Sequence, residues 1–248
     1  MRIILSGAGG AMGRTTIATV KNHPEHVIVA GVDKFADPSS FDFPVYDSFV
    51  KVTEKADCII DFSVKAALKG ILEYAVKNDV PVVLCTTGYD SDDTAAIKAA
   101  AAKVPVLMSG NMSLGVNTLI KLVKEAAKAL SGADIEIIEQ HHHNKADAPS
   151  GTAKMLLNAA KEIRGELTPV YGREGIVGKR RPEEIGVHAV RGGSIVGKHE
   201  VMFILNNEIV SLKHEAESKA VFSEGALRAA AFLTSSPAGL YSMSDVLK

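Results

Sequence analysis

Short apolar runs alternate with amphipathic, helix-like segments through the first half of the chain. The apolar runs predict strands at residues 2–6, 27–32, 57–61, 80–85 and 104–108. The segments between them predict helices from the glycines after residue 6 to about Lys21, and over residues 64–77 and 91–103. Strands that are apolar without a break, and separated by helices, are typical of a parallel sheet covered on both faces.

The pattern changes after Gly110, where strands become more frequent and the alternation of strand and helix is lost. We expect helices at 115–130, 151–164 and 222–233, a strand at 134–140, and successive strands from 186 to 214. Asn206-Asn207 separates two alternating runs and predicts a hairpin turn. A parallel α/β half followed by a strand-rich α+β half indicates two domains.

Composition and charge exclude several classes of protein. The 248 residues include 28 Lys and Arg against 29 Asp and Glu, so the net charge of −1 gives no electrostatic footprint for nucleic acid. No apolar run is long enough to span a bilayer, and the apolar N-terminus is too short for a signal peptide. Cys58 and Cys85 lie in apolar runs and are expected to be reduced thiols. We therefore expect a soluble cytoplasmic protein that binds neither nucleic acid nor membrane.

A glycine-rich loop, Gly7–Gly13, lies directly between the first predicted strand and the first predicted helix. Glycines allow the tight turn and let backbone N–H groups approach a pyrophosphate, and the helix N-terminus adds partial positive charge. The spacing departs from G-x-G-x-x-G, because Met12 takes the third glycine position and Gly13 follows it. The position between strand and helix nevertheless predicts a dinucleotide-binding site rather than a simple turn.

The second predicted strand ends at Asp33, twenty residues after Gly13. An acidic side chain at this place accepts hydrogen bonds from the ribose hydroxyls of NADH, although a plain strand-end turn is the alternative. Lys34 follows, and its ammonium group could bind the 2′-phosphate of NADPH. The pair predicts NADH, NADPH or both as the cofactor.

The carboxyl ends of the later strands belong to the same edge of the predicted sheet. They carry the segments Asp61–Ser63, Cys85–Gly88 and Ser109–Met112. Ligands of such sheets bind beyond this edge, so Thr86, Thr87 and Gly88 are expected near the nicotinamide ribose, with a plain turn as the alternative. Ser63 is more readily explained as a helix cap.

Most of the candidate catalytic and binding side chains lie close together in one segment, EQHHHNKADAPSGTA, Glu139–Ala153. We predict no metal site, because consecutive residues that leave a strand point in alternating directions and no Cys pair accompanies the histidines. Ser150-Gly151-Thr152 begins a predicted helix, and such an N-terminus binds anions. Lys145 adds positive charge, and either His141 or His142 could supply a proton near neutral pH. This combination favours a site for a small carboxylate over an ordinary polar loop.

At these residues the chain resembles the dihydrodipicolinate reductase family, also called 4-hydroxy-tetrahydrodipicolinate reductases, over nearly its whole length. The motifs that carry the resemblance are GAGGAMGR, DFS, TTGYD, GNMSLGVN, EQHHHNKADAPSGTA, RGGSIVGKHEV and FSEGALRAA. The histidine-to-PSGTA segment is the most specific of them. The chain departs from the family at Cys85, where relatives often have glycine, and at Asp33-Lys34, where some have Glu-Arg.

The resemblance implies a role for each candidate site residue. His141 would be the general acid, and Lys145 would act in both catalysis and substrate binding. His142, Gly151 and Thr152 would complete the substrate site. The residues implied at the cofactor site are Gly7, Ala8, Gly9, Gly10, Ala11, Met12, Asp33, Lys34, Cys85, Thr86, Thr87, Ser109, Gly110, Asn111 and Met112.

The resemblance also implies the architecture. It predicts an α/β protein with an N-terminal Rossmann domain and a smaller α+β domain that has an open mixed sheet. Residues 1–112 and 220–248 would form the dinucleotide-binding domain, and residues 113–219 the domain for substrate binding and oligomerisation. Family members are homotetramers whose second domains pack their sheets together, so a homotetramer is expected here.

The implied reaction is the NAD(P)H-dependent reduction of 4-hydroxy-tetrahydrodipicolinate, a small dicarboxylate, in lysine and diaminopimelate biosynthesis. Two alternatives use the same glycine loop. One is another two-domain NAD(P)-dependent dehydrogenase of a small amino or hydroxy acid, which leaves the PSGTA segment without a role. The other is a non-catalytic NAD(H)-binding sensor, which has no need for the histidine and lysine.

Overall fold

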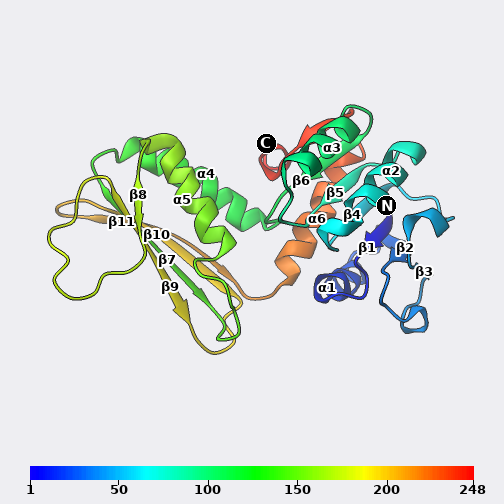
Figure 1. Ribbon diagram of the computed structural model, residues 1–248, viewed down its shortest axis with the longest axis horizontal. Helices are drawn as coiled ribbons and strands as arrows, with labels where there is room; N and C mark the ends of the chain where they lie inside the picture. Colours follow the sequence, from blue (N-terminus) through cyan, green and yellow to red (C-terminus); the bar gives the residue numbers. More distant parts are fainter. The chain divides into compact units, whose positions relative to one another are not determined.

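The computed structural model describes residues 1–248 and divides the chain into two compact units. Unit 1 comprises Met1–Leu114 and Lys219–Lys248, and unit 2 comprises Gly115–Ser218 (Figure 1). The chain therefore leaves unit 1 once and returns to it for its final segment. None of the helices combines the length and the apolar character that crossing a membrane requires.

Unit 1 is built on a parallel sheet of seven strands in the order β12-β6-β5-β4-β1-β2-β3. The strands are β1 Arg2–Ser6, β2 Val27–Val32, β3 Val45–Tyr46, β4 Cys58–Asp61, β5 Val82–Leu84, β6 Pro105–Met108 and β12 Gly239–Tyr241. From β1, the strands β2 and β3 follow toward one edge of the sheet, whereas β4, β5 and β6 follow toward the other edge. The switch point between β1 and β4 is where such sheets bind ligands.

Helices cover both faces of this sheet, as the unbroken apolar strands predict. They are α1 Ala11–Val20, α2 Leu68–Asn78, α3 Ser91–Ala101, α6 Ala220–Leu233 and α7 Met243–Val246. Helices α1, α6 and α7 share one core with side chains such as Ile3 and Leu5, and α2 and α3 share the other with Ile4 and Ile59. The expected Rossmann architecture is confirmed. Strands β3 and β12 were not anticipated, because two or three residues are too few to show a period.

Unit 2 contains a mixed sheet of five strands in the order β11-β10-β7-β9-β8. Its strands are β7 Asp134–His141, β8 Thr168–Val170, β9 Glu184–Arg191, β10 Gly197–Ile204 and β11 Ile209–Ala216. Strand β10 runs antiparallel to both of its neighbours, whereas β9 runs parallel to β7 and β8. Ile204 pairs with Ile209, and the N–H of Leu205 donates to the carbonyl of Glu208, so the predicted hairpin turn is confirmed.

Two helices, α4 Leu114–Ala129 and α5 Gly151–Arg164, cover one face of the sheet of unit 2 (Figure 1). Alternate side chains of β7, such as Ile135 and Ile137, are buried beneath them, while Glu136 and Ile138 point to the opposite face. No helix of the unit packs on that opposite face, which we call the outer face.

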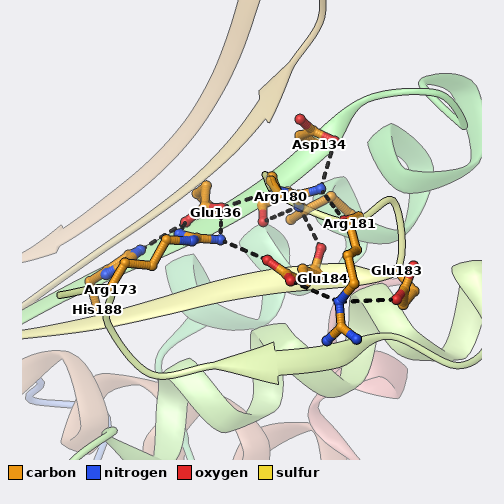
Figure 2. A network of polar contacts seen from close by, with 9 residues as sticks. Asp134, Glu136, Arg173, Arg180, Arg181, Glu183, Glu184 and His188 are labelled. Carbon is orange, nitrogen blue, oxygen red and sulfur yellow. Dashed lines mark hydrogen bonds and ion pairs between the residues drawn. The ribbon is translucent and has the colours of Figure 1, made fainter. Parts of the chain in front are cut away.

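A network of ion pairs ties the segment between β8 and β9 to the outer face (Figure 2). Both oxygens of Glu136 accept hydrogen bonds from Arg173, each at 3.1 Å, and His188 Nε2 lies 2.8 Å from the same carboxylate. Arg180 bonds Asp134 at 2.6 Å. Sequence patterns do not reveal this network, because its partners lie up to fifty-two residues apart.

Candidate functional site

The glycine loop connects β1 to α1 in a conformation that requires glycine. Gly7 has a φ of +78°, and a Cβ at Gly13 would lie 2.1 Å from the carbonyl oxygen of Gly7. The N–H of Gly10 closes the turn on the same carbonyl oxygen at 3.1 Å. The missing side chains let α1 begin directly against the strand, so backbone N–H groups and the helix N-terminus lie at the switch point.

A cavity of about 590 Å³ lies beside this loop within unit 1. It is lined from the ends of β1, β2 and β4, and the predicted residues Gly7, Gly10, Asp33 and Lys34 contribute to it. Ala8 is fully buried, Gly9 is half-buried, and Ala11 and Met12 form the first turn of α1. The lining residues that sequence reasoning did not assign to the cofactor include Ser6, Phe35, Phe49, Phe62 and Ser63.

The carboxylate of Asp33 is held in place by backbone donors. It accepts hydrogen bonds from the N–H groups of Gly9 at 2.9 Å, Phe35 at 3.0 Å and Ala36 at 3.2 Å. A carboxylate has about four acceptor positions, so one position remains for a ribose hydroxyl. Asp33 thus organises the loop as well as facing the cavity, while Lys34 beside it is exposed.

Asp61, at the end of β4, is fully buried and joins two strand ends. It accepts hydrogen bonds from Thr86 Oγ1 at 2.7 Å and from the N–H of Ser63 at 3.0 Å. Burial raises the pKa of the Asp61 carboxyl, and the hydrogen bonds from Ser63 and Thr86 oppose that shift. The sequence noted Asp61 only as part of a strand end, whereas the structure shows that it orients the predicted Thr86.

The remaining strand-end residues lie in two loops after β5 and β6. Thr87 and Gly110 are neighbours, since a Cβ at Gly110 would lie 3.6 Å from Thr87 Cγ2. Ser109 Oγ donates to the carbonyl of Asn111, and the side chain of Met112 is buried in the core. Cys85 is an unpaired thiol whose pKa is raised by burial. The Met112 side chain therefore contributes to the core, and its carbonyl oxygen packs closely against Gly225 of α6.

In unit 2, one buried carboxylate organises the predicted catalytic segment. Glu139 on β7 is completely buried, and its Oε2 lies 2.6 Å from His141 Nδ1. Arg191 on β9 donates to both oxygens, at 2.7 and 2.8 Å, and the N–H of Ser150 donates at 2.9 Å. Burial alone would raise the pKa of Glu139, but these hydrogen bonds outweigh it and leave the pKa below its usual value.

The other ring nitrogen of His141 faces a glycine. A Cβ at Gly197 on β10 would lie 3.1 Å from His141 Nε2, so the glycine avoids a tight contact on that side of the ring. His199, also on β10, packs its ring against His141 at 5.2 Å between centroids. Burial first, then the charge of His141, lowers the pKa of His199 to about 4, so His199 is neutral near pH 7.

The predicted anion site lies at the first turn of α5. Ser150 caps the helix by accepting from the N–H of Ala153, and its hydroxyl lies 2.9 Å from His199 Nε2. Gly151 and Thr152 form the turn that follows, where the helix dipole leaves partial positive charge. The structure therefore brings the start of this helix to the residues that hold His141.

The rest of the histidine-lysine segment forms a loop. Lys145 pairs with Asp147 at 2.7 Å, a partner that sequence reasoning did not foresee. The N–H of His142 donates to the carbonyl of Ile195, and His143 is exposed. No group of three or more His, Cys, Asp or Glu side chains is arranged to hold a metal ion.

Comparison with protein families matches both halves of the chain to one family. Residues 1–112 match the family described as "Dihydrodipicolinate reductase, N-terminus", and residues 115–247 match "Dihydrodipicolinate reductase, C-terminus". The 4-hydroxy-tetrahydrodipicolinate reductases of Caldanaerobacter subterraneus subsp. tengcongensis and Clostridium novyi are 47% and 45% identical. In both cases 100% of this chain aligns with 98% of the relative.

Solved structures agree on the fold. A dipicolinate-bound dihydrodipicolinate reductase from Paenisporosarcina sp. TG-14 superposes with a TM-score of 0.82 at 24% identity, covering 98% of this chain and 97% of that one. A diaminopimelate dehydrogenase from Corynebacterium glutamicum superposes with a TM-score of 0.59 at 14% identity, covering 100% and 95%. The chain belongs to the dihydrodipicolinate reductase family, the NAD(P)H-dependent oxidoreductases that reduce 4-hydroxy-tetrahydrodipicolinate in lysine and diaminopimelate biosynthesis.

Proposed function

We propose that the chain performs the reaction of its family with a division of labour between its two units. Unit 1 binds NADH or NADPH at the glycine loop, and unit 2 binds the dicarboxylate and supplies the proton. The observation that carries the assignment is the hydrogen bond between Glu139 and His141 beside the start of α5. The carboxylate of Glu139 thus connects a proton donor, His141, to an anion site at the start of α5.

The residues around the glycine loop fit a dinucleotide. The positive φ of Gly7 and the close packing of Gly13 leave room for phosphates at the N-terminus of α1. Asp33 retains an acceptor position for a ribose hydroxyl, and the loops of Cys85–Thr87 and Ser109–Met112 offer backbone groups at the neighbouring strand ends. When bound, the reduced nicotinamide supplies the hydride that the reaction requires.

The substrate is bound through its carboxylates. Gly151 and Thr152 offer the partial positive charge of a helix N-terminus to one carboxylate, and Lys145 adds a full charge. Lys145 exchanges its exposed partner, Asp147, for the substrate, and His142 contacts the same ligand. The Paenisporosarcina reductase was solved with dipicolinate, an aromatic dicarboxylate of this class. Fixing a carboxylate in this way also fixes the orientation of the ring.

His141 acts as the general acid. The hydroxylated substrate first loses water to give a conjugated ring, and hydride addition at ring carbon 4 then places negative charge on that ring. His141 donates a proton from Nε2 to the adjacent carbon, which balances the charge, and later regains a proton from solvent. Lys145 stabilises the negative charge as it develops.

The decisive experiment replaces His141 by Gln and Lys145 by Met. His141→Gln should lower kcat by about 10²–10⁴ and leave the substrate KM nearly unchanged, because its proton matters in the transition state. Lys145→Met should raise the substrate KM as well as lower kcat, with cofactor affinity unaffected. The exposed His143→Gln is the matched control. If His142→Gln abolishes turnover and His141→Gln does not, the acid is assigned to the wrong histidine.

The proposal includes a cytoplasmic homotetramer. Two unpaired cysteines suit a reducing compartment. The outer face of unit 2 displays Ile138, Val190, Met202, Ile204 and Ile209 without a covering helix. A sheet face of this kind suits burial against the same face of a second copy.

A further inference from the structure

The two oxygens of the Glu139 carboxylate bond two different parts of the proposed site in unit 2, the His141 ring and the first turn of α5. Oε2 lies on His141 Nδ1 at 2.6 Å, and Oε1 accepts from the N–H of Ser150 at 2.9 Å, at the start of α5. Arg191 spans both oxygens at 2.7 and 2.8 Å. The side chain is completely buried, although no step of the proposed reaction uses it directly.

We propose that Glu139 is a positioning residue for the reaction. It holds the proton donor, His141, at a fixed position relative to the carboxylate-binding N-terminus of α5. The inference rests on the proposed function of His141 and adds a residue that acts through it. Arg191 has a supporting role, because its guanidinium keeps the buried carboxylate ionised.

The orientation of the imidazole follows from this hydrogen bond. A carboxylate accepts but does not donate, so Nδ1 must carry a proton and donate it to Oε2. The ring is then fixed with Nε2 as the nitrogen that gives up its proton. Nε2 lies beside Gly197, where an added Cβ would come to 3.1 Å from it. The substrate can reach this nitrogen only if that orientation is maintained.

The neighbouring strands and the following loop contribute several charged or titratable side chains near His141. Glu139 on β7 contacts the ring, Arg191 on β9 pairs with Glu139, and Lys145 in the loop pairs with Asp147. His199 on β10 is neutral near pH 7, and His214 on β11 lies opposite His199 in register. Glu139 is therefore the only anion with a hydrogen bond to the ring.

The same carboxylate also fixes the distance between the two functions. Ser150 is the N-cap of α5, and its N–H is bonded to Glu139, so the first turn of the helix cannot move independently of His141. A glutamine at position 139 has one acceptor oxygen. It could accept from His141 Nδ1–H or from the N–H of Ser150, but its amide nitrogen would then face the other donor. Loss of Glu139 should thus disturb turnover and substrate binding together.

The test is a double-mutant cycle between positions 139 and 141. Glu139→Gln should lower kcat by about 10–10² and raise the substrate KM, with the cofactor dissociation constant unchanged. The fall of kcat at high pH should move to lower pH, because the imidazolium loses its anionic partner. In the Glu139→Gln/His141→Gln variant, kcat should match that of His141→Gln within about twofold, since Glu139 acts through His141.

The matched control is Glu136→Gln on the same strand. Glu136 also bonds an arginine and a histidine, Arg173 and His188, but on the outer face (Figure 2). This variant should keep the wild-type pH profile and kcat. If Glu139→Gln does not fold, the Glu139→Gln/Arg191→Gln variant removes both charges of the ion pair and allows the same pH profile to be measured.

Two results would overturn the inference. One is a kcat loss in the double variant that multiplies the two single losses, and the other is an unchanged pH profile in Glu139→Gln. The proposed function fails in a different way, because His141→Gln itself would then retain normal kcat. A low kcat in His141→Gln with a normal Glu139→Gln removes the positioning role alone.

Discussion

At the scale of single residues, Gly197 lies beside the ring of His141, the proposed proton donor. Replacing Gly197 with Ala would place a Cβ 3.1 Å from His141 Nε2, a tight contact that the imidazole ring would have to relieve by shifting. We expect Gly197→Ala to lower kcat by about tenfold, while cofactor affinity stays normal because the cofactor loop lies in unit 1. Steady-state kinetics and a cofactor titration measure both effects. Gly192→Ala, where a Cβ meets nothing within 4 Å, is the control.

Lys34 is the residue at which preference between the two cofactors is expected to be set. The charge of Asp33 would repel a 2′-phosphate and that of Lys34 would attract one. Lys34 is exposed, and its ammonium group is a point charge that lacks the bidentate geometry of an arginine. We expect dual use, with NADH at least as good as NADPH. Lys34→Ala should raise the KM for NADPH several-fold and barely change that for NADH. Lys77→Ala, on α2, should change neither, and an equal effect of Lys34→Ala on both cofactors would contradict the assignment.

At the scale of elements, His199 links β10 to the first turn of α5 through Ser150. Its pKa falls from 6.5 to about 4 in the folded protein, mainly because of burial. Between these pH values the unfolded chain binds more protons, so the free energy of unfolding should decrease as the pH falls from 6.5 to 4. The full difference between these two pKa values corresponds to on the order of 3 kcal/mol.

Urea unfolding at pH 6.5 and pH 4.5 tests this coupling. His199→Gln should lose much of the pH dependence, because glutamine does not titrate. His143→Gln removes an exposed histidine of the same unit and should keep the wild-type dependence. If the free energy of unfolding of His199→Gln decreases with falling pH as steeply as that of the wild type, other groups account for the loss of stability at low pH.

At the scale of the whole molecule, the outer face of unit 2 is the surface proposed to join four copies. Ile204 lies on this face, because Phe203 before it is fully buried in the core and Leu205 packs against the same core. Ile204→Asp would bury an unpaired charge in the assembly, so we expect monomers or dimers in sedimentation velocity. Ile163→Asp, at an exposed apolar position on α5, should sediment like the wild type. A wild-type chain that sediments as a monomer at micromolar concentration would refute the assembly.

Local patterns along the chain were enough to predict a parallel sheet in the first half, a strand-rich second half and the segments that carry the functional residues. Unbroken apolar strands require burial on both faces, and alternating strands such as β7 require burial on one, so local periodicity indicates how each sheet is covered. The open mixed sheet of the second half was implied by the family resemblance and not by periodicity. The need for glycine at positions 7 and 13 could also be predicted from the sequence, because the backbone geometry there excludes other residues. Short strands such as β3 and β12 are not, because they are too brief to show a period.

The residues that hold the predicted ones in place became visible only when the strands were paired in the folded protein. The motif around His141 does not indicate that Arg191, fifty-two residues after Glu139, neutralises that carboxylate. Nor does it indicate that Gly197 lies beside Nε2, or that Asp33 is bonded by three backbone donors. Each of these features depends on which strands become neighbours. The pairing of strands buries apolar surface across the whole sheet, so it cannot be inferred from the polar residues that it brings together.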